Sequence, residues 1–329
     1  MGFNQVLVSF CVKCFNQERY IGEALKGAFS QTYRPLEIVI SDDASTDSSW
    51  EIITAAVDEY RRQPGAAEVV LNRNAENLGN LGNWLAICSL AKGELLVKAD
   101  GDDVSLPNRA ETIAKAWMAD GCRATSVSHG GLLIGPRGQR MGPMRGVSAE
   151  SPAGAVMAFA RCTHESFGGA DCLRMVDDEL FALRARMLGP ELVLQDRLVL
   201  YRLGTGISNS LWGMREPMVR GRRDLLAALR QARRDLGKVA GRMSAPERDE
   251  WDARLDGAER RTEAELALFA GETFAARLDG FRKTGPARLL SVWQFLRLAF
   301  LLPRPVGSCL LHAYAAVRYA ARRAVGIML

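Results

Sequence analysis

The chain has 329 residues, of which 48% are hydrophobic and 25% are charged. These values are ordinary for a globular protein, so they exclude extensive disorder, and the length allows one large domain with appendages. The net charge of +5 comes from the C-terminal end, because residues 286–329 hold six arginines and no acid while the remainder has 37 basic and 38 acidic residues. A basic, apolar tail on a neutral body favours an anionic membrane surface as partner rather than nucleic acid.

The seven cysteines are odd in number and irregular in spacing, and the N-terminus does not resemble a secretory signal. Both observations predict a reducing compartment. We therefore expect a cytoplasmic protein, with the basic tail holding it peripherally on the inner face of the cytoplasmic membrane.

The first hundred residues alternate short β-rich runs with amphipathic helical patterns. The β-rich runs are 6–12, 36–40, 68–71 and 95–98, and the helical patterns lie near 20–31, 47–62 and 80–92. Alternation at this spacing predicts crossover connections and a mainly parallel sheet. In such sheets the ligand crevice lies beyond the carboxyl ends of the strands.

Acidic and amide side chains follow each of these four strands, so we expect them to converge on one rim of the sheet. They are Asn16 to Tyr20, Asp42 and Asp43, Asn72 to Asn77, and Asp100 to Asp103. The last group places three carboxylates within four residues at the end of a buried strand, where they repel one another unless they share a cation. Oxygen-only ligands favour Mg²⁺ or Mn²⁺. The alternative is a solvated acidic turn, since Asp is common in turns.

The second hundred residues carry weaker signals. Residues 124–142 predict an antiparallel hairpin with its turn at Gly135–Gly138, 166–171 predict a tight turn lining the site, and 192–203 predict a helix holding Asp196. Beyond residue 217, apolar residues at heptad spacing predict two antiparallel helices, the second starting at Ser244. This helical pair is also the expected surface for any homo-oligomer.

The tail begins with fourteen mostly apolar residues, 289–302, which are too few to span a bilayer. Apolar residues and arginines then alternate over 310–323 in a pattern typical of a helix lying in a membrane interface; the alternative is a core helix flanked by arginines. The predicted organisation is therefore an α/β domain over 1–211, a helical hairpin over 212–285 and a basic apolar tail over 286–329.

Four segments in order resemble glycosyltransferase family 2, whose members have the GT-A fold. They are residues 8–49, 77–80, 91–109 and 194–202. The resemblance covers about residues 5–210, and residues 212–329 resemble no family. It implies an α/β fold of the GT-A class, with a Rossmann-like, mainly parallel sheet, followed by a C-terminal α-helical region.

The resemblance implies transfer of a sugar, with inversion, from a nucleoside diphosphate donor to a hydroxyl group. A uridine or thymidine donor is favoured, and the acceptor is expected to be a glycan or lipid-linked glycan of a bacterial surface polysaccharide. Asp102 and Asp103 would hold Mg²⁺ or Mn²⁺. Asp196 matches the general base, with Asp171 as the alternative.

The same resemblance implies a set of residues that bind the nucleotide sugar. Phe15 stands where an aromatic ring stacks on the base, and Asp43 where a carboxylate accepts the uracil N3 hydrogen. The full set is Phe15, Asn16, Glu18, Asp42, Asp43, Asn77, Asn83, Asp100 and Asp102.

Two departures from the family pattern leave alternatives open. Lys13 and Cys14 replace a common Pro-Thr, and Gln195 replaces an acid. A catalytically inactive sugar-nucleotide-binding or scaffold protein is therefore the main alternative. A dinucleotide-dependent dehydrogenase would need a glycine-rich turn after the first strand, where this chain has the single glycine Gly22.

Overall fold

The computed structural model describes residues 5–144, 154–173, 175–205 and 215–270. The chain divides into two compact units between Leu203 and Gly204. The predicted basic tail, 286–329, lies outside the described residues. Within the described ranges no helix is both long enough and apolar enough to cross a bilayer.

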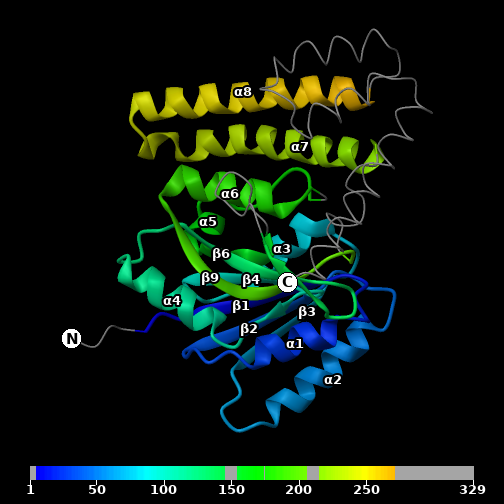
Figure 1. Cartoon of the computed structure of the whole chain (residues 1–329). Helices are drawn as coiled ribbons and strands as arrows, with labels where there is room; N and C mark the ends of the chain where they lie inside the picture. The colour runs from blue at the N-terminus through cyan, green and yellow to red at the C-terminus, as the bar shows by residue number, and fades with distance from the viewer. Residues whose placement is uncertain (1–4, 145–153, 174, 206–214, 271–329) are drawn as a thin grey trace. The chain divides into compact units, whose positions relative to one another are not determined.

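The first unit alternates strands and helices as the sequence predicts over its first hundred residues (Figure 1). Its strands are β1 (Val8–Cys14), β2 (Leu36–Asp42), β3 (Glu68–Arg73), β4 (Leu95–Asp100), β5 (Val104–Ser105), β6 (Ser126–Ile134), β7 (Arg140–Pro143), β8 (Met157–Ala160) and β9 (Glu191–Arg202). Its helices are α1 (Ile21–Phe29), α2 (Ser49–Arg61), α3 (Gly79–Leu90), α4 (Arg109–Ala119), the short η1 (Gly154–Val156), α5 (Cys162–Glu165) and α6 (Asp177–Leu188).

The described strands form one mixed sheet in the order β3-β2-β1-β4-β8-β6-β9-β5, with β7 paired to β6. Strands β3, β2, β1 and β4 are mutually parallel, as predicted from their helical crossovers. Strand β8 runs antiparallel between β4 and β6, and β6 and β7 form the predicted antiparallel hairpin. The carboxyl ends of β1, β2 and β4 therefore meet at one edge.

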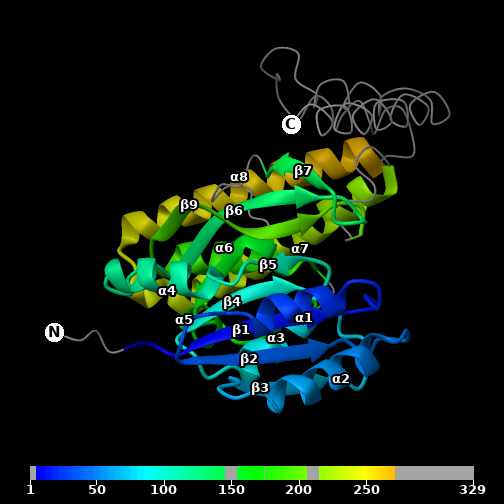
Figure 2. The ribbon, with the colours of Figure 1, turned by 60° about the horizontal axis from the view of Figure 1, so that its bottom comes forward.

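Helices lie on both faces of the sheet (Figures 1 and 2). Alternation along the strands divides the side chains between these two layers. Phe10 and Val12 of β1 and Val97 of β4 belong to the apolar core shared with α1, α2 and α4. Lys13, which follows Val12, and Lys98, which follows Val97, face the opposite layer, where α3 and α6 pack. The sheet thus carries an apolar face and, at its carboxyl edge, a polar face.

The helix predicted over 192–203 is wrong, because this segment is strand β9. Leu192 to Arg202 satisfies a two-residue alternation as well as a helical period, and parallel pairing with β6 decides between them. Asp196 consequently lies in the middle of a strand rather than on a helix.

The second unit contains the helices α7 (Arg215–Val239) and α8 (Ala245–Ala270), joined through the short η2 (Ala240–Arg242). Buried apolar residues such as Leu229, Leu236, Leu255 and Leu268 line the two helices. Ion pairs show that the helices are antiparallel, since Arg222 meets Glu265 at 2.9 Å and Arg233 meets Glu259 at 3.0 Å. At the start of α8, Ser244 and Glu247 exchange hydrogen bonds as a capping box.

Candidate active site

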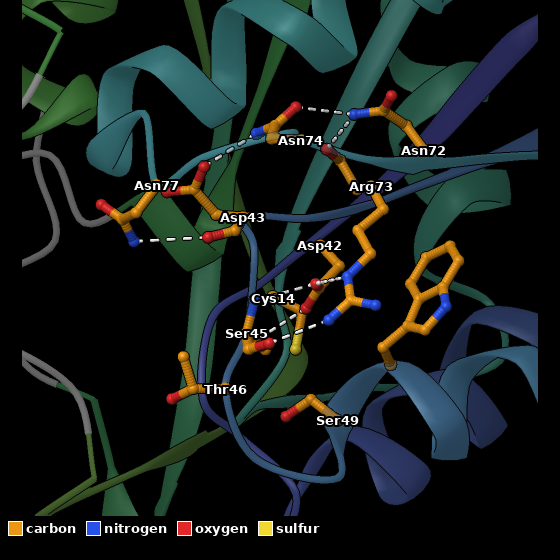
Figure 3. A network of polar contacts seen from close by, with 12 residues as sticks. Cys14, Asp42, Asp43, Ser45, Thr46, Ser49, Asn72, Arg73, Asn74 and Asn77 are labelled. Atoms are coloured by element: carbon orange, nitrogen blue, oxygen red, sulfur yellow. Dashed lines mark hydrogen bonds and ion pairs between the residues drawn. The ribbon is translucent and has the colours of Figure 1, made fainter.

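A polar network occupies the carboxyl ends of β2 and β3 (Figure 3). Asp42 is fully buried, its Oδ2 accepts a 3.0 Å hydrogen bond from the Ser45 N–H, and it forms a 3.4 Å ion pair with Nε of Arg73. Arg73 also donates to the Ser45 carbonyl and lies over the Trp50 ring. Asp42 therefore holds the loop between β2 and α2.

Asp43, which lies between Asn74 and Asn77 in Figure 3, fixes the start of α3. Its Oδ1 accepts hydrogen bonds from Nδ2 of Asn74 at 2.8 Å and from the Leu78 N–H at 2.9 Å, and its Oδ2 accepts from the Gly79 N–H at 2.9 Å. These last two groups are among the N–H groups that a helix N-terminus leaves free, and a carboxylate suits them. Asp43 is buried, with 3% of its surface exposed.

The other predicted nucleotide-binding side chains also tie loops together. Oδ1 of Asn16 accepts from the Thr46 N–H, Oε2 of Glu18 accepts from the Ser48 N–H, and Asn77 donates to the Asp43 carbonyl. Asn83, on α3, is buried and donates to the Ser41 carbonyl at 3.2 Å. The structure thus brings these residues to one edge of the sheet.

Phe15 directly follows β1 and is exposed, with 44% of its surface open to solvent. An exposed aromatic ring beside a network of polar side chains is a surface on which a nucleobase can stack.

The acidic run, Asp100–Asp103, covers the last residue of β4 and the turn before β5. Arg202, at the end of β9, holds this run in place. Asp103 is buried, and its Oδ1 accepts a 2.7 Å hydrogen bond from the Arg202 N–H. The Arg202 side chain donates from Nε to the Asp102 carbonyl at 2.9 Å. Burial raises the pKa of Asp103 well above its ordinary value, and the charges of Asp102 and Asp100 add to that rise.

An ion-pair cluster of Lys13, Lys98, Asp100, Asp177 and Asp178 joins the acidic run to the start of α6. The Lys98 ammonium, 1% exposed, lies 2.8 Å from Oδ2 of Asp177 and also contacts Oδ1 of Asp178. The Lys13 ammonium lies 3.1 Å from Asp177 and 3.3 Å from Oδ1 of Asp100. Asp178 is fixed further by a 2.9 Å hydrogen bond from the Gly154 N–H.

The two adjacent acids of this cluster have opposite pKa shifts. Burial alone would raise the pKa of Asp177, but the ammonium groups of Lys13 and Lys98 outweigh it and hold that pKa well below its ordinary value. For Asp178 burial dominates, and the neighbouring Asp177 charge adds to it, so the pKa of Asp178 is raised despite Lys98. Adjacent carboxylates with divergent pKa values are typical of sites that use one acid for proton transfer.

A divalent cation fits the acidic run as far as its residues can supply ligands. Asp100 and Asp102 flank Gly101 at the end of β4, and Oδ1 of Asp100 is buried without a hydrogen-bond partner. An added Cβ at Gly101 would lie 2.4 Å from Oε1 of Gln17 and 3.1 Å from the Lys13 carbonyl oxygen, so a larger side chain would require its neighbours to shift. No set of three or more His, Cys, Asp or Glu side chains converges as a metal site among the described residues. A cation here would therefore take its remaining ligands from donor phosphates and water.

Asp196 lies away from Arg202, the residue of β9 that contacts the acidic run. Asp196 is exposed in the middle of β9, six residues before Arg202, which corresponds to about 20 Å along a strand. Asp171 is exposed in the segment before α6. The assignment of the general base to Asp196, with Asp171 as the alternative, stays a prediction. The acids that the fold places beside Asp100 are Asp177 and Asp178, which sequence reasoning missed although two acids at a helix start were a visible signal.

The sheet order and the acidic rim define a GT-A domain, which confirms the predicted fold class. Residues 9–145 match the model of the family described as Glycosyl transferase family 2. The predicted resemblance to glycosyltransferase family 2 is confirmed over this region.

Among curated proteins, 97 residues are 32% identical to the UDP-Glc:alpha-D-GlcNAc-diphosphoundecaprenol beta-1,3-glucosyltransferase WfaP of Escherichia coli, covering 30% of this chain and 36% of that protein. Other curated relatives are also matched over only part of their length, and three of these matches cover between 25% and 34% of the relative.

Two solved structures share the fold over most of this chain. The structure of S. aureus TarS 1–349 in complex with UDP-GlcNAc has a TM-score of 0.52 at 16% identity, covering 84% of this chain and 89% of that one. The mannosyltransferase PcManGT from Pyrobaculum calidifontis, in complex with GDP-Man and Mn²⁺, has a TM-score of 0.56 at 20% identity, covering 98% and 83%.

Proposed function

We propose that this protein transfers a sugar from a nucleoside diphosphate donor to a hydroxyl group of a glycan or lipid-linked glycan, with inversion and with help from Mg²⁺ or Mn²⁺. The observation that carries the proposal is the ion-pair cluster, which joins Asp100 at the donor side to Asp178, a carboxylate with a raised pKa. Donor binding and proton transfer are thereby assigned to neighbouring groups of one rim.

On the donor side, Phe15 would stack on the base, and Asp43 lies at the same edge to read its polar groups. Asp100 and Asp102 would hold the cation, which offsets the negative charge that develops on the departing nucleoside diphosphate. The earlier assignment of Asp103 to the metal is less favourable, because one of its oxygens is committed to the Arg202 N–H. A uridine donor is supported by WfaP, which uses UDP-Glc, and by TarS, which binds UDP-GlcNAc, whereas PcManGT binds GDP-Man.

On the acceptor side, we assign the general base to Asp178 in preference to Asp196. A base must reach the proton of the attacking hydroxyl, so it has to lie beside the donor-binding rim. Lys98 and the Gly154 N–H fix the Asp178 carboxylate there, whereas Asp196 is exposed elsewhere on β9. Direct attack by the activated hydroxyl on the anomeric carbon would invert its configuration.

A lipid-linked acceptor in bacterial surface polysaccharide synthesis is supported by the description of WfaP, which acts on a diphosphoundecaprenol-linked sugar. The six arginines of 286–329 support a place at the anionic inner face of the membrane.

A thermal-shift panel of the full chain with UDP, dTDP and GDP, with and without Mn²⁺, tests donor binding, because a ligand that binds only the folded state raises its melting temperature. We expect UDP with Mn²⁺ to stabilise the wild type and the Asp58→Asn control, whose exposed acid lies on α2, but not Asp102→Asn. Equal shifts in all three proteins would contradict the assignment of Asp102. Stabilisation by UDP without any transfer activity would favour the inactive binding protein instead.

A further inference from the structure

Lys13 is a cation built into the site at the end of β1. Only 11% of its side chain is exposed, and its ammonium contacts Oδ1 of Asn80, both carboxylate oxygens of Asp177 at 3.2 and 3.1 Å, and Oδ1 of Asp100 at 3.3 Å. The hydrogen bonds to Asn80 and to the two oxygens of Asp177 use the three N–H donors that an ammonium group has, and Asp100 is held by charge alone. Lys13 is therefore held in one place rather than solvated.

Asp100 depends on this ammonium for compensation. Its Oδ1 is buried and accepts no hydrogen bond in the described part of the chain, and Lys13 is its ion-pair partner there. Asp177 differs, because it has Lys98 as a second cation at 2.8 Å. Removal of the Lys13 charge would thus leave Asp177 in an ion pair with Lys98 and remove the ion pair of Asp100.

We propose that Lys13 competes with the divalent cation for Asp100 and thereby weakens metal binding at the acidic run. A divalent ion that used Oδ1 of Asp100 would lie within a few ångströms of the Lys13 ammonium, and like charges at that separation in a partly buried site repel strongly. The oxygen that would serve the ion is also the one that Lys13 occupies. The inference rests on the proposed function only in taking Asp100 as a cation-binding side chain.

The contacts of Lys13 with Asn80 and Asp177 also explain why Lys13 stays in place when a divalent cation binds. Asn80 on α3 and Asp177 on α6 hold the ammonium from one side while Asp100 approaches from β4. A cation that binds must therefore displace Asp100 from Lys13 without displacing Lys13 itself. Replacement of Lys13 by a neutral side chain removes both the repulsion and the competition, so both effects act in the same direction.

The test is a titration of the full chain with Mn²⁺ alone, followed by electron paramagnetic resonance of the free ion and by calorimetry. We expect Lys13→Met to bind Mn²⁺ at least about tenfold more tightly than wild type. A tenfold ratio corresponds to about 1.4 kcal/mol of binding free energy. Lys13→Arg, which keeps the charge, should bind like wild type. Lys92→Met removes an exposed lysine paired with Glu68 and should also leave the affinity unchanged.

The double variant Lys13→Met with Asp100→Asn locates the effect, because it should lose the gain in affinity. Each variant is scored only if its circular dichroism spectrum matches wild type, and Lys13→Gln, which can still bond to Asn80, replaces Lys13→Met if the latter does not fold. Equal or weaker Mn²⁺ binding by the neutral variants, or no binding by any of the proteins, overturns the inference. Because no nucleotide is present, a gain in affinity would support it even if the chain proved inactive in transfer.

Discussion

The carboxylate of Asp103 accepts a 2.7 Å hydrogen bond from the backbone N–H of Arg202, which lies 99 positions further along the chain. The Arg202 side chain completes the connection, since it donates to the Asp102 carbonyl and pairs with Oε2 of Glu23 at 2.8 Å. Its guanidinium also lies 4.8 Å from the centre of the Tyr20 ring. The last residue of β9 therefore fixes the acidic run against the loop and helix that follow β1.

Replacement of Arg202 should destabilise the domain strongly. Arg202 is 2% exposed, and its loss would leave buried acceptors and a neighbouring carboxylate without their cation. We expect Arg202→Met to lower the free energy of unfolding by about 3–5 kcal/mol, as measured by urea denaturation. Arg197→Met, at an exposed position of the same strand, is the matched control and should cost less than about 0.5 kcal/mol. A loss below about 1 kcal/mol for Arg202→Met would show that this connection is dispensable.

Replacement of Asp43 should lower both the stability of the domain and its affinity for UDP, and the two effects can be measured separately. Asp43→Asn turns one acceptor oxygen into a donor that faces a backbone N–H at the start of α3, so we expect a loss of about 1–3 kcal/mol in stability. If Asp43 also reads the base, calorimetry on the folded variant should show UDP affinity reduced by a similar amount. Asn74→Ala removes one partner of Asp43 but keeps its carboxylate, and serves as the control. Lower stability with unchanged UDP affinity would restrict Asp43 to the structural role.

Because His129 is buried in its neutral form, the free energy of unfolding should fall as the pH drops below about 6.5. Nε of Arg109 donates a 3.0 Å hydrogen bond to Nε2 of His129, so Nδ1 carries the imidazole proton and donates to the Gly130 carbonyl. Burial, followed by the Arg109 charge, lowers the pKa of His129 from 6.5 to about 3. Below pH ~6.5 the unfolded chain takes up a proton that the folded chain refuses, so stability drops by about 1.4 kcal/mol per pH unit until the folded pKa is reached.

Urea denaturation from pH 7.5 to 5 measures this dependence. The His129→Gln variant, whose side-chain oxygen can still accept from Arg109, should show a shallower decline than wild type because one titrating group has been removed. Parallel curves for the two proteins would mean that His129 does not titrate as its surroundings indicate.

The sequence predicts the first hundred residues well because each element there has one clear periodicity. Strands β1, β2 and β4 begin or end within two residues of their predicted bounds, and the amphipathic patterns become α1, α2 and α3. Strand β9 is different, since its alternation of Leu, Val and polar residues also fits a helix. Its parallel partner β6 lies more than fifty residues earlier, so local pattern could not decide.

The candidate site was predictable where its residues follow a strand and unpredictable where pairing is distant. Asp42, Asp43 and Asp100 could be placed at the rim from alternation and crossover topology alone. The partnership of Lys13 with Asp177 spans 164 positions and depends on which face α6 covers, so no spacing in the sequence indicates it. The same distance concealed Asp178 as a candidate base, whereas the prediction of Asp196 came from the resemblance of residues 194–202 to the family pattern.

The most direct test of the account is transfer of sugar from a UDP-sugar to a lipid-linked glycan acceptor by purified full-length protein, compared among the wild type, Asp178→Asn and Asp196→Asn. An amide in place of the carboxylate preserves shape but cannot take the acceptor's proton, and general base catalysis typically contributes about 10²–10⁴-fold. We predict product formation by wild type and by Asp196→Asn, and a loss of at least about a hundredfold in turnover for Asp178→Asn with nucleotide affinity retained. Near wild-type turnover by Asp178→Asn with collapse of Asp196→Asn would contradict the assignment of the base, and no transfer by the wild type with any nucleotide sugar would contradict the proposed function.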